Sequence, residues 1–180
     1  MSNSLFKLID YSLIPAALMV VGKLVGIFLI AGLFSIHIEV RTLANALFAF
    51  ETLVAPDDLP LISSYSDLFA FALMAFGFAF ILISALYFHE SHMQISTLNK
   101  LAKFDMLSLI KGSFELYHSG FVWLIFLWLA NLLILINVSL QRTYLWTFIV
   151  TSVFAMALTI IFLKDLLQEV QLARKKSLLH

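Results

Sequence analysis

The residues best suited to chemistry are polar side chains that interrupt long apolar stretches of the chain. Lys23 is the only charged residue within Leu13–Ile36. An ammonium group near the centre of a bilayer costs ~2.5 kcal/mol or more, so a polar partner is expected. Asn131 lies ten residues into another apolar stretch, as Lys23 does in its own, which places both roughly 15 Å deep. Ser152 falls close to the same level on a further stretch.

Lys23, Asn131 and Ser152 therefore form a predicted polar site at the membrane midplane. One interpretation is functional, because polar groups inside a membrane bind substrates or ions or relay protons. The other is structural: Lys23 extends toward the surface or bonds Asn131 and so holds the bundle together. The sequence leaves both interpretations open.

A second group of polar residues has the composition of a metal site. His89 and His92 are three positions apart, as are Glu115 and His118, so each pair lies on one face of a helix. The two pairs fall at the ends of neighbouring antiparallel spans, which brings them within reach of each other. Two histidines and a carboxylate suit zinc or non-haem iron. The alternative is that all four are solvated residues at the membrane surface.

The composition excludes several classes of protein. Of the 180 residues, 62% are hydrophobic and 12% are charged, whereas soluble domains carry about a quarter charged residues. The net charge of zero argues against a nucleic-acid surface. The absence of cysteine removes thiolate nucleophiles and cysteine-ligated zinc or iron–sulfur sites. No nucleophile elbow, P-loop or dinucleotide fingerprint occurs, so no catalytic residue is assigned and no cofactor is expected apart from the metal alternative.

Four stretches are long enough to cross a bilayer, which takes about 20 apolar residues in a helix. They cover residues 13–36, 68–88, 121–139 and 144–163. The short segment Leu140–Thr143 joins the last two, which predicts an antiparallel hairpin. We therefore predict an all-α fold, an integral-membrane four-helix bundle, with residues 1–180 as a single transmembrane domain.

The segments between the spans carry weaker patterns. Ile38–Val54 mixes charged and apolar residues in a way that predicts a helix lying in the membrane interface, on the outer side. Asp67 is predicted to cap the N-terminus of the second span. The segment His89–Gly120 predicts an amphipathic cytoplasmic connector, and Lys164–His180 predicts a helix that leaves the membrane.

Positively charged residues are unevenly distributed between the two sides. Eight lysines and arginines lie in the N-terminal tail, the connector and the C-terminal tail, and only Arg41 and Arg142 lie on the other side. The positive-inside rule then places both termini and the connector in the cytoplasm.

Small residues recur along two of the spans. Gly22 and Gly26 are four positions apart, and Ala70, Gly77 and Ser84 recur every seven. Such seams let helices approach closely in lipid, where packing drives association. They serve packing inside one chain as readily as contact between copies.

The connector carries the clearest likeness to a known family. The run Leu101–Leu109 (LAKFDMLSL) is similar to the L-G-K-x-D-x-x-S-L run of the YqhA-like bacterial inner-membrane proteins. The chain also resembles them in Leu13–Pro15, similar to their Leu-x-Pro, and in its four spans, while Ala102 replaces a family glycine and the third span shows little similarity. The resemblance implies a bacterial inner-membrane protein that forms oligomers and has no established activity. Its motif positions in this sequence are Glu90, Lys103, Asp105 and Ser108.

Together these observations predict a non-enzymatic membrane component: an oligomeric channel or transporter-like protein, or a subunit of a larger complex. The expected partners are the lipid bilayer and further copies or other membrane subunits, and no nucleic acid. The alternative is a metal-dependent membrane enzyme or redox subunit that uses His89, His92, Glu115 and His118.

Overall fold

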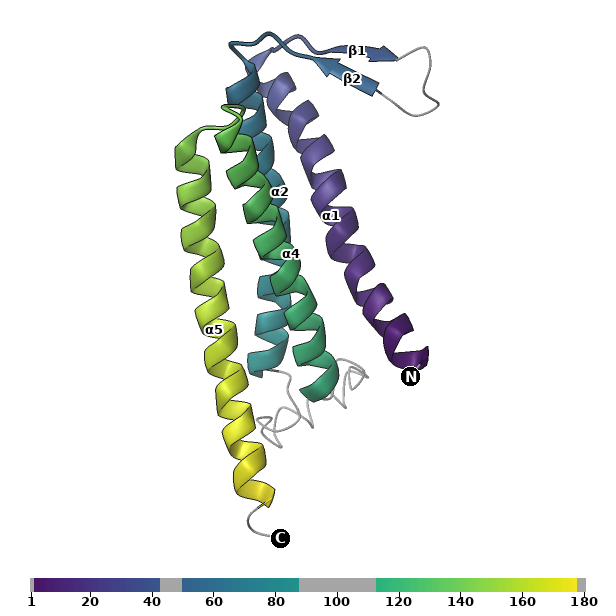
Figure 1. Cartoon of the computed structure of the whole chain (residues 1–180), viewed down its shortest axis with the longest axis vertical. Helices are drawn as coiled ribbons and strands as arrows, with labels where there is room; N and C mark the ends of the chain where they lie inside the picture. The colour runs from purple at the N-terminus through teal and green to yellow at the C-terminus, as the bar shows by residue number, and fades with distance from the viewer. Residues whose placement is uncertain (1, 43–49, 88–112, 178–180) are drawn as a thin grey trace, which may run out of the picture.

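The computed structural model describes residues 2–42, 50–87 and 113–177. Within these ranges the chain forms four long helices and one short hairpin (Figure 1). The elements are α1 (Ser2–Phe34), β1 (Glu39–Thr42), β2 (Phe50–Leu53), α2 (Leu59–Tyr87), α4 (Ser113–Ser139) and α5 (Leu145–Ser177).

Helices α2 and α4 occupy the centre of the bundle, because each packs against the three other helices. Helices α1 and α5 lie on opposite sides, and α1 diverges from α4 toward its N-terminal end (Figure 1). The two chain termini lie at one end of the bundle, and the β1–β2 hairpin and the α4–α5 turn lie at the other (Figure 1).

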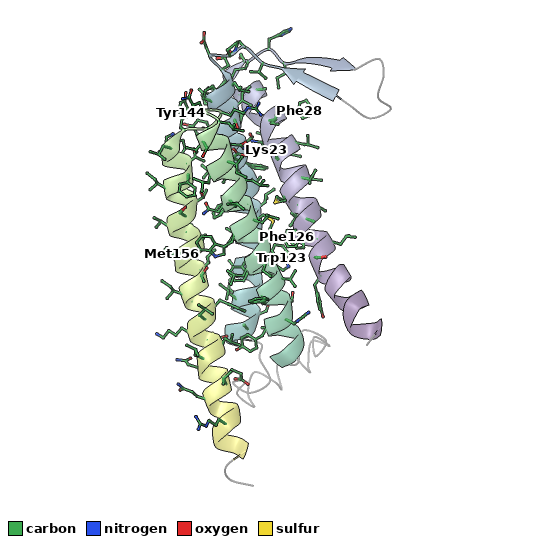
Figure 2. The ribbon with its side chains drawn as sticks, in the orientation of Figure 1. Lys23, Phe28, Trp123, Phe126, Tyr144 and Met156 are labelled. Carbon is green, nitrogen blue, oxygen red and sulfur yellow. The ribbon has the colours of Figure 1, made fainter. Side chains whose placement is uncertain are left out.

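All four helices are long and apolar enough to cross a membrane, over Tyr11–Phe34, Leu59–Ala85, Leu116–Ser139 and Leu145–Gln171. The prediction of four long apolar helices is confirmed. Many large apolar side chains point outward, such as Met156 on α5 (Figure 2). Exposed apolar patches of this extent are rare on monomers in water, whereas they are what a helix presents to lipid.

The apolar core lies between α2, α4 and α5. Its most enclosed large side chains are Met74 and Phe78 of α2, Leu127 of α4 and Phe162 of α5. Among the described side chains of α1, from Tyr11 to Phe34, only the partly buried Leu18 and Met19 pack against this core. The bundle is therefore a three-helix core with α1 packed against its side.

The predicted interfacial helix over Ile38–Val54 is wrong in the described residues. Strands β1 and β2 pair there in antiparallel fashion, from Glu39 opposite Leu53 to Thr42 opposite Phe50. The cause is visible in the sequence from Ile38 to Thr42, where apolar and polar residues alternate with the period of a strand. Residues 43–49 lie outside the described part of the chain.

The N-terminal cap predicted at Asp67 is also wrong. Helix α2 begins at Leu59, so Asp67 lies more than two turns inside it. Asp58 occupies the cap position instead, where its carbonyl oxygen accepts the first helical hydrogen bond from the backbone N–H of Ile62 at 3.0 Å. Pro60 falls in the first turn, where a missing N–H costs little, so it starts this helix rather than ending the preceding segment.

The other connections agree with prediction where they are described. Leu140–Thr143 turns the chain between α4 and α5. Helix α5 continues without a break to Ser177, which confirms a helical C-terminal segment. Helix α4 begins at Ser113, so the end of the predicted connector is part of that helix. The rest of the connector, residues 88–112, lies outside the described residues.

The small-residue seams contact neighbouring helices within the chain. A Cβ atom added at Gly26 would lie 3.0 Å from the Cα of Ser66, and one at Gly22 would lie 3.2 Å from the Cα of Ala70. Glycine is therefore what lets α1 lie directly on α2. Gly77 similarly leaves room for the ring of Trp123 on α4.

Candidate functional site

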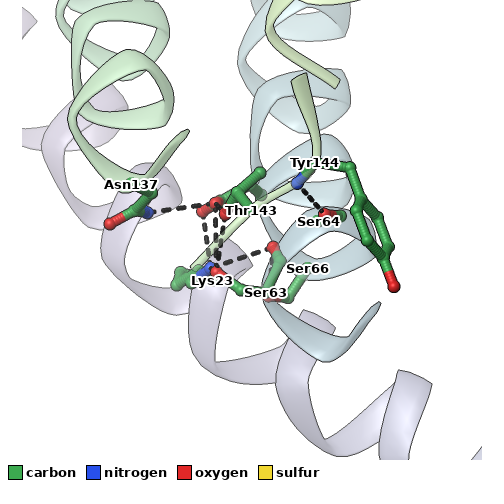
Figure 3. Close-up of polar contacts among 8 residues, drawn as sticks. Lys23, Ser63, Ser64, Ser66, Asn137, Thr143 and Tyr144 are labelled. Atoms are coloured by element: carbon green, nitrogen blue, oxygen red, sulfur yellow. Dashed lines mark hydrogen bonds and ion pairs between the residues drawn. The ribbon is translucent and has the colours of Figure 1, made fainter. Parts of the chain in front are cut away.

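An ion pair inside the bundle is the centre of the candidate site. Lys23 of α1 donates from Nζ to Oδ1 of Asp67 on α2 at 2.5 Å (Figure 3). Lys23 Nζ also donates to the backbone oxygen of Ser63 at 3.2 Å and to its hydroxyl at 3.4 Å. The side chain of Lys23 is 29% exposed and that of Asp67 is 9% exposed. The Lys23 side chain is therefore the more exposed of the two.

The other carboxylate oxygen of Asp67, Oδ2, accepts hydrogen bonds from side chains of α2, α4 and the α4–α5 turn. Its Oδ2 accepts hydrogen bonds from Asn137 Nδ2 and Thr143 Oγ1, both at 3.0 Å, and a longer one from Ser63 Oγ at 3.4 Å (Figure 3). Asn137 lies near the end of α4, and Thr143 lies in the turn before α5. The carboxylate therefore joins α1, α2, α4 and the α4–α5 turn, and both charges are well supplied with partners.

One turn of α2 supplies most of this site. Ser64 accepts a hydrogen bond from the backbone N–H of Tyr144 at 2.8 Å, next to the start of α5 (Figure 3). Ser66 donates to the backbone oxygen of Ser63 at 3.1 Å and faces Gly26 of α1. The run Ser63–Asp67 is therefore helical, and its buried residues Ser64, Ser66 and Asp67 contact neighbouring parts of the chain, whereas Tyr65 is exposed.

Asn131 and Ser152, which the sequence grouped with Lys23, form a separate polar layer. Asn131 Nδ2 donates to Ser152 Oγ at 3.0 Å, and Thr151 Oγ1 donates to Asn131 Oδ1 at 2.8 Å. Asn131 precedes Asn137 by six residues, so this layer lies about 9 Å nearer the N-terminal end of α4 than the Lys23–Asp67 pair does. The structure thus brings two of the three predicted residues together and places Lys23 elsewhere.

The difference has a geometric cause. Counting residues from each predicted span start assumes parallel helices that begin at one level. Helix α1 is inclined to α4 (Figure 1), and α4 begins eight residues before the predicted start at Phe121. The missed residue is Asp67. A buried ammonium calls for a carboxylate, and Asp67 is the acidic residue nearest an apolar span in the sequence, which is the signal that could have identified it.

Three threonines at the start of α5 and in the turn before it link the two layers. Thr147 and Thr151 are four positions apart on α5 and so lie on one face, and Thr143 precedes them in the turn. The outer two bond to Asp67 and Asn131, as described above. Thr147 is fully buried, and its hydroxyl has no hydrogen-bond partner within the described ranges.

A further polar contact lies toward the other end of the bundle. Tyr117 of α4 donates to Asp165 of α5 at 2.8 Å, and Asp165 is 5% exposed. The residues between it and the Asn131 layer include the buried Leu127 and Phe162. The apolar core therefore separates this contact from the two polar layers.

The predicted metal ligands are placed only in part. His118 lies on α4, where its ring meets that of Tyr11 of α1 edge to face, with centroids 6.2 Å apart. Glu115 lies in α4, but its side chain is outside the described part, as are His89 and His92. Among the side chains that the structure describes, no three of His, Cys, Asp or Glu are grouped to hold a metal. The family-motif positions, Glu90, Lys103, Asp105 and Ser108, also lie outside the described residues.

A groove adjoins the ion pair between α1, α2 and α4. Its volume is about 360 Å³, and nine of its twelve lining residues are apolar. The three polar residues that line it are Lys23, Asp67 and Asn137. The site therefore combines a hydrogen-bonded ion pair with an apolar hollow.

Comparisons of the chain with protein-family models, with curated proteins and with solved structures each found no match.

Proposed function

We propose that this protein spans the bacterial plasma membrane four times, with both termini in the cytoplasm. The length and apolar surface of the four helices support the proposal. Both termini lie at one end of the bundle, as an even number of spans requires (Figure 1). The excess of lysine and arginine at that end supports a cytoplasmic location for it.

Labelling of single cysteines tests this topology, because the chain has no cysteine of its own. Leu140 in the α4–α5 turn and Gln171 of α5 are both exposed and lie toward opposite ends of the bundle. In intact cells, a membrane-impermeant maleimide is expected to label Leu140→Cys and to leave Gln171→Cys unlabelled until the membrane is opened. The reverse pattern would invert the topology, and labelling of both would refute the four spans.

We further propose that the protein is a non-enzymatic membrane component, either an oligomeric channel or transporter-like protein or a subunit of a larger assembly. The observation that carries this proposal is the Lys23–Asp67 pair with its ring of hydrogen bonds inside the candidate spans. Ionisable residues at such positions are costly, and they mark ion or substrate pathways or contacts between helices. A site for alternating access lies between structural repeats, and a chain of four spans without a clear repeat needs further copies to build one.

The test is the mass and conductance of the protein in nanodiscs and planar bilayers. A channel or transporter-like protein is expected to form a defined oligomer, whose conductance is lost in the double variant Lys23→Met/Asp67→Leu. Asn131→Leu is the matched comparison, because it removes the other polar layer and leaves the ion pair intact. A monomer that passes no current, in wild type and variants alike, would overturn the channel and leave only the subunit role, which requires co-purifying membrane proteins.

Elemental analysis of the purified protein for zinc and iron distinguishes the non-enzymatic proposal from the metal-dependent alternative. A non-enzymatic protein is expected to contain no stoichiometric zinc or iron. Bound metal that is lost when His89→Ala and His118→Ala are combined would favour the enzyme instead.

A further inference from the structure

The groove beside the ion pair has the features of a ligand site. Ligand pockets have volumes of roughly 300–1,000 Å³ and are mainly apolar, with a few polar groups that orient the ligand. This groove has a volume of about 360 Å³ and runs along α4 from Ala130 to Asn137, a length of about 10 Å. Its rim residues Val20 and Leu133 are 58% and 42% exposed, so the groove opens at the outer, apolar surface of the bundle.

Lys23 is the more exposed of the two charged side chains in the groove, by 29% against 9%. One of its three hydrogen bonds, to Ser63 Oγ, is long at 3.4 Å and is readily exchanged. In the described part of the chain, Asn137 uses one amide N–H on Asp67 and leaves the second N–H unbonded. An ammonium and an amide N–H at one end of an apolar groove complement a carboxylate.

We propose that this groove binds a fatty acid from the bilayer, with its carboxylate at Lys23 and Asn137 and its acyl chain between α1 and α4. This inference is independent of any transport or channel role. It rests on the shape of the groove, its apolar lining and the partial exposure of the Lys23 side chain.

The small number of polar groups at this end of the groove, Lys23, Asp67 and Asn137, favours a small head group over a phospholipid. On α1 the polar end is followed by exposed apolar side chains such as Phe28 (Figure 2). On α4 it lies two residues before the end of the helix at Ser139. Hydrogen bonds from Lys23 and Asn137 can hold a carboxylate there. A glycerophosphate, in contrast, brings more polar groups than the groove can satisfy.

The test is native mass spectrometry of the full-length protein from a non-ionic detergent, titrated with dodecanoate. Wild type is expected to bind one dodecanoate. Leu133→Trp fills the rim of the groove and is expected to weaken binding by about tenfold or more, because its ring takes space that the acyl chain would occupy. Leu132→Trp is the matched control, because Leu132 is also exposed on α4 but does not line the groove. Methyl dodecanoate, which has no charge, is expected to bind about tenfold more weakly than the acid.

Three results would each overturn the proposal: no dodecanoate adduct on wild type, equal binding by the two tryptophan variants, or equal binding of acid and methyl ester. Displacement of dodecanoate by phosphatidylglycerol at equal concentration would assign the groove to a phospholipid instead. Both tryptophan substitutions leave Lys23 and Asp67 intact, so a thermal unfolding curve that matches wild type shows that each variant is folded.

Discussion

Removal of the Lys23 ammonium tests whether the ion pair holds the bundle together. Breaking a buried pair by removing one partner typically costs 3–5 kcal/mol. Lys23→Met leaves Asp67, 9% exposed, with three remaining donors from Asn137, Thr143 and Ser63. Because these hydrogen bonds still stabilise the carboxylate, we expect a cost at the lower end of that range, about 3 kcal/mol.

The reciprocal change should cost less. In Asp67→Leu, the ammonium of Lys23 is 29% exposed and has a long, flexible side chain. It can turn toward a polar environment, so we expect a cost of about 2 kcal/mol. The double variant Lys23→Met/Asp67→Leu leaves no unpaired charge and should also cost about 2 kcal/mol. The double-mutant cycle then gives a coupling energy of about 3 kcal/mol, at the upper end for residues in contact.

The assay is reversible unfolding in mixed micelles by titration with sodium dodecyl sulfate, followed by circular dichroism. Measured couplings between polar groups inside membrane proteins average about 0.6 kcal/mol. A coupling energy at or below that value would refute the argument that the pair is a main contact between α1 and the rest of the bundle. A double variant less stable than either single variant would show that the apolar replacements do not pack.

Two further predictions concern packing and buried hydroxyl groups, measured in the same assay. Gly26→Ala should destabilise the protein by roughly 1–3 kcal/mol, because the added Cβ would lie 3.0 Å from the Cα of Ser66. The control is Gly32→Ala, which should be neutral because its Cβ would meet nothing within 4 Å. Equal effects of the two substitutions would refute the close approach of α1 to α2. Thr147→Val should be neutral or stabilising, because the hydroxyl that it removes is buried without a partner in the described residues. Thr151→Val should instead cost roughly 1–3 kcal/mol, because it removes a hydrogen-bond donor to Asn131. A destabilised Thr147→Val would reveal a partner for the Thr147 hydroxyl.

The helices were predictable from the sequence because their signal is large and local. A run of some twenty apolar residues has few alternatives to a long helix, whatever surrounds it. The ends of the helices were less predictable, because the prediction relies on polar residues in the sequence to mark them. Ser63–Asp67 is polar, yet the helix begins before it at Leu59, since these polar groups bond to α1, α4 and the α4–α5 connection. Polarity marks the end of a helix only when its groups are solvated.

The candidate site was predictable in kind but not in its members. The sequence indicates that Lys23 needs a partner inside the bundle, and that Asn131 and Ser152 lie at one depth. The sequence does not specify the tilt of α1 or the register between helices. A shift of α1 by about 9 Å along α4 is enough to place Lys23 in one polar layer instead of the other. The small residues Gly22 and Gly26 likewise indicate a close neighbour, while only the fold shows that the neighbour is α2.

Helix α1 depends on the ion pair more than the other helices do. The core side chains that are most enclosed all come from α2, α4 and α5. Among the described side chains of α1, from Tyr11 to Phe34, the buried residues are Pro15, Gly22, Gly26 and Ala31, none of which has a large side chain to bury. Close backbone packing and the Lys23–Asp67 pair are therefore its main attachments.

Loss of the pair should consequently loosen α1 before the core. In hydrogen exchange of Lys23→Met, the amides of α1 should lose protection while those of α2 and α4 keep it, because local opening follows local contact energy. If α1 and α2 lost protection together, the four helices would form one cooperative unit, and the ion pair would stabilise the whole bundle rather than the attachment of α1.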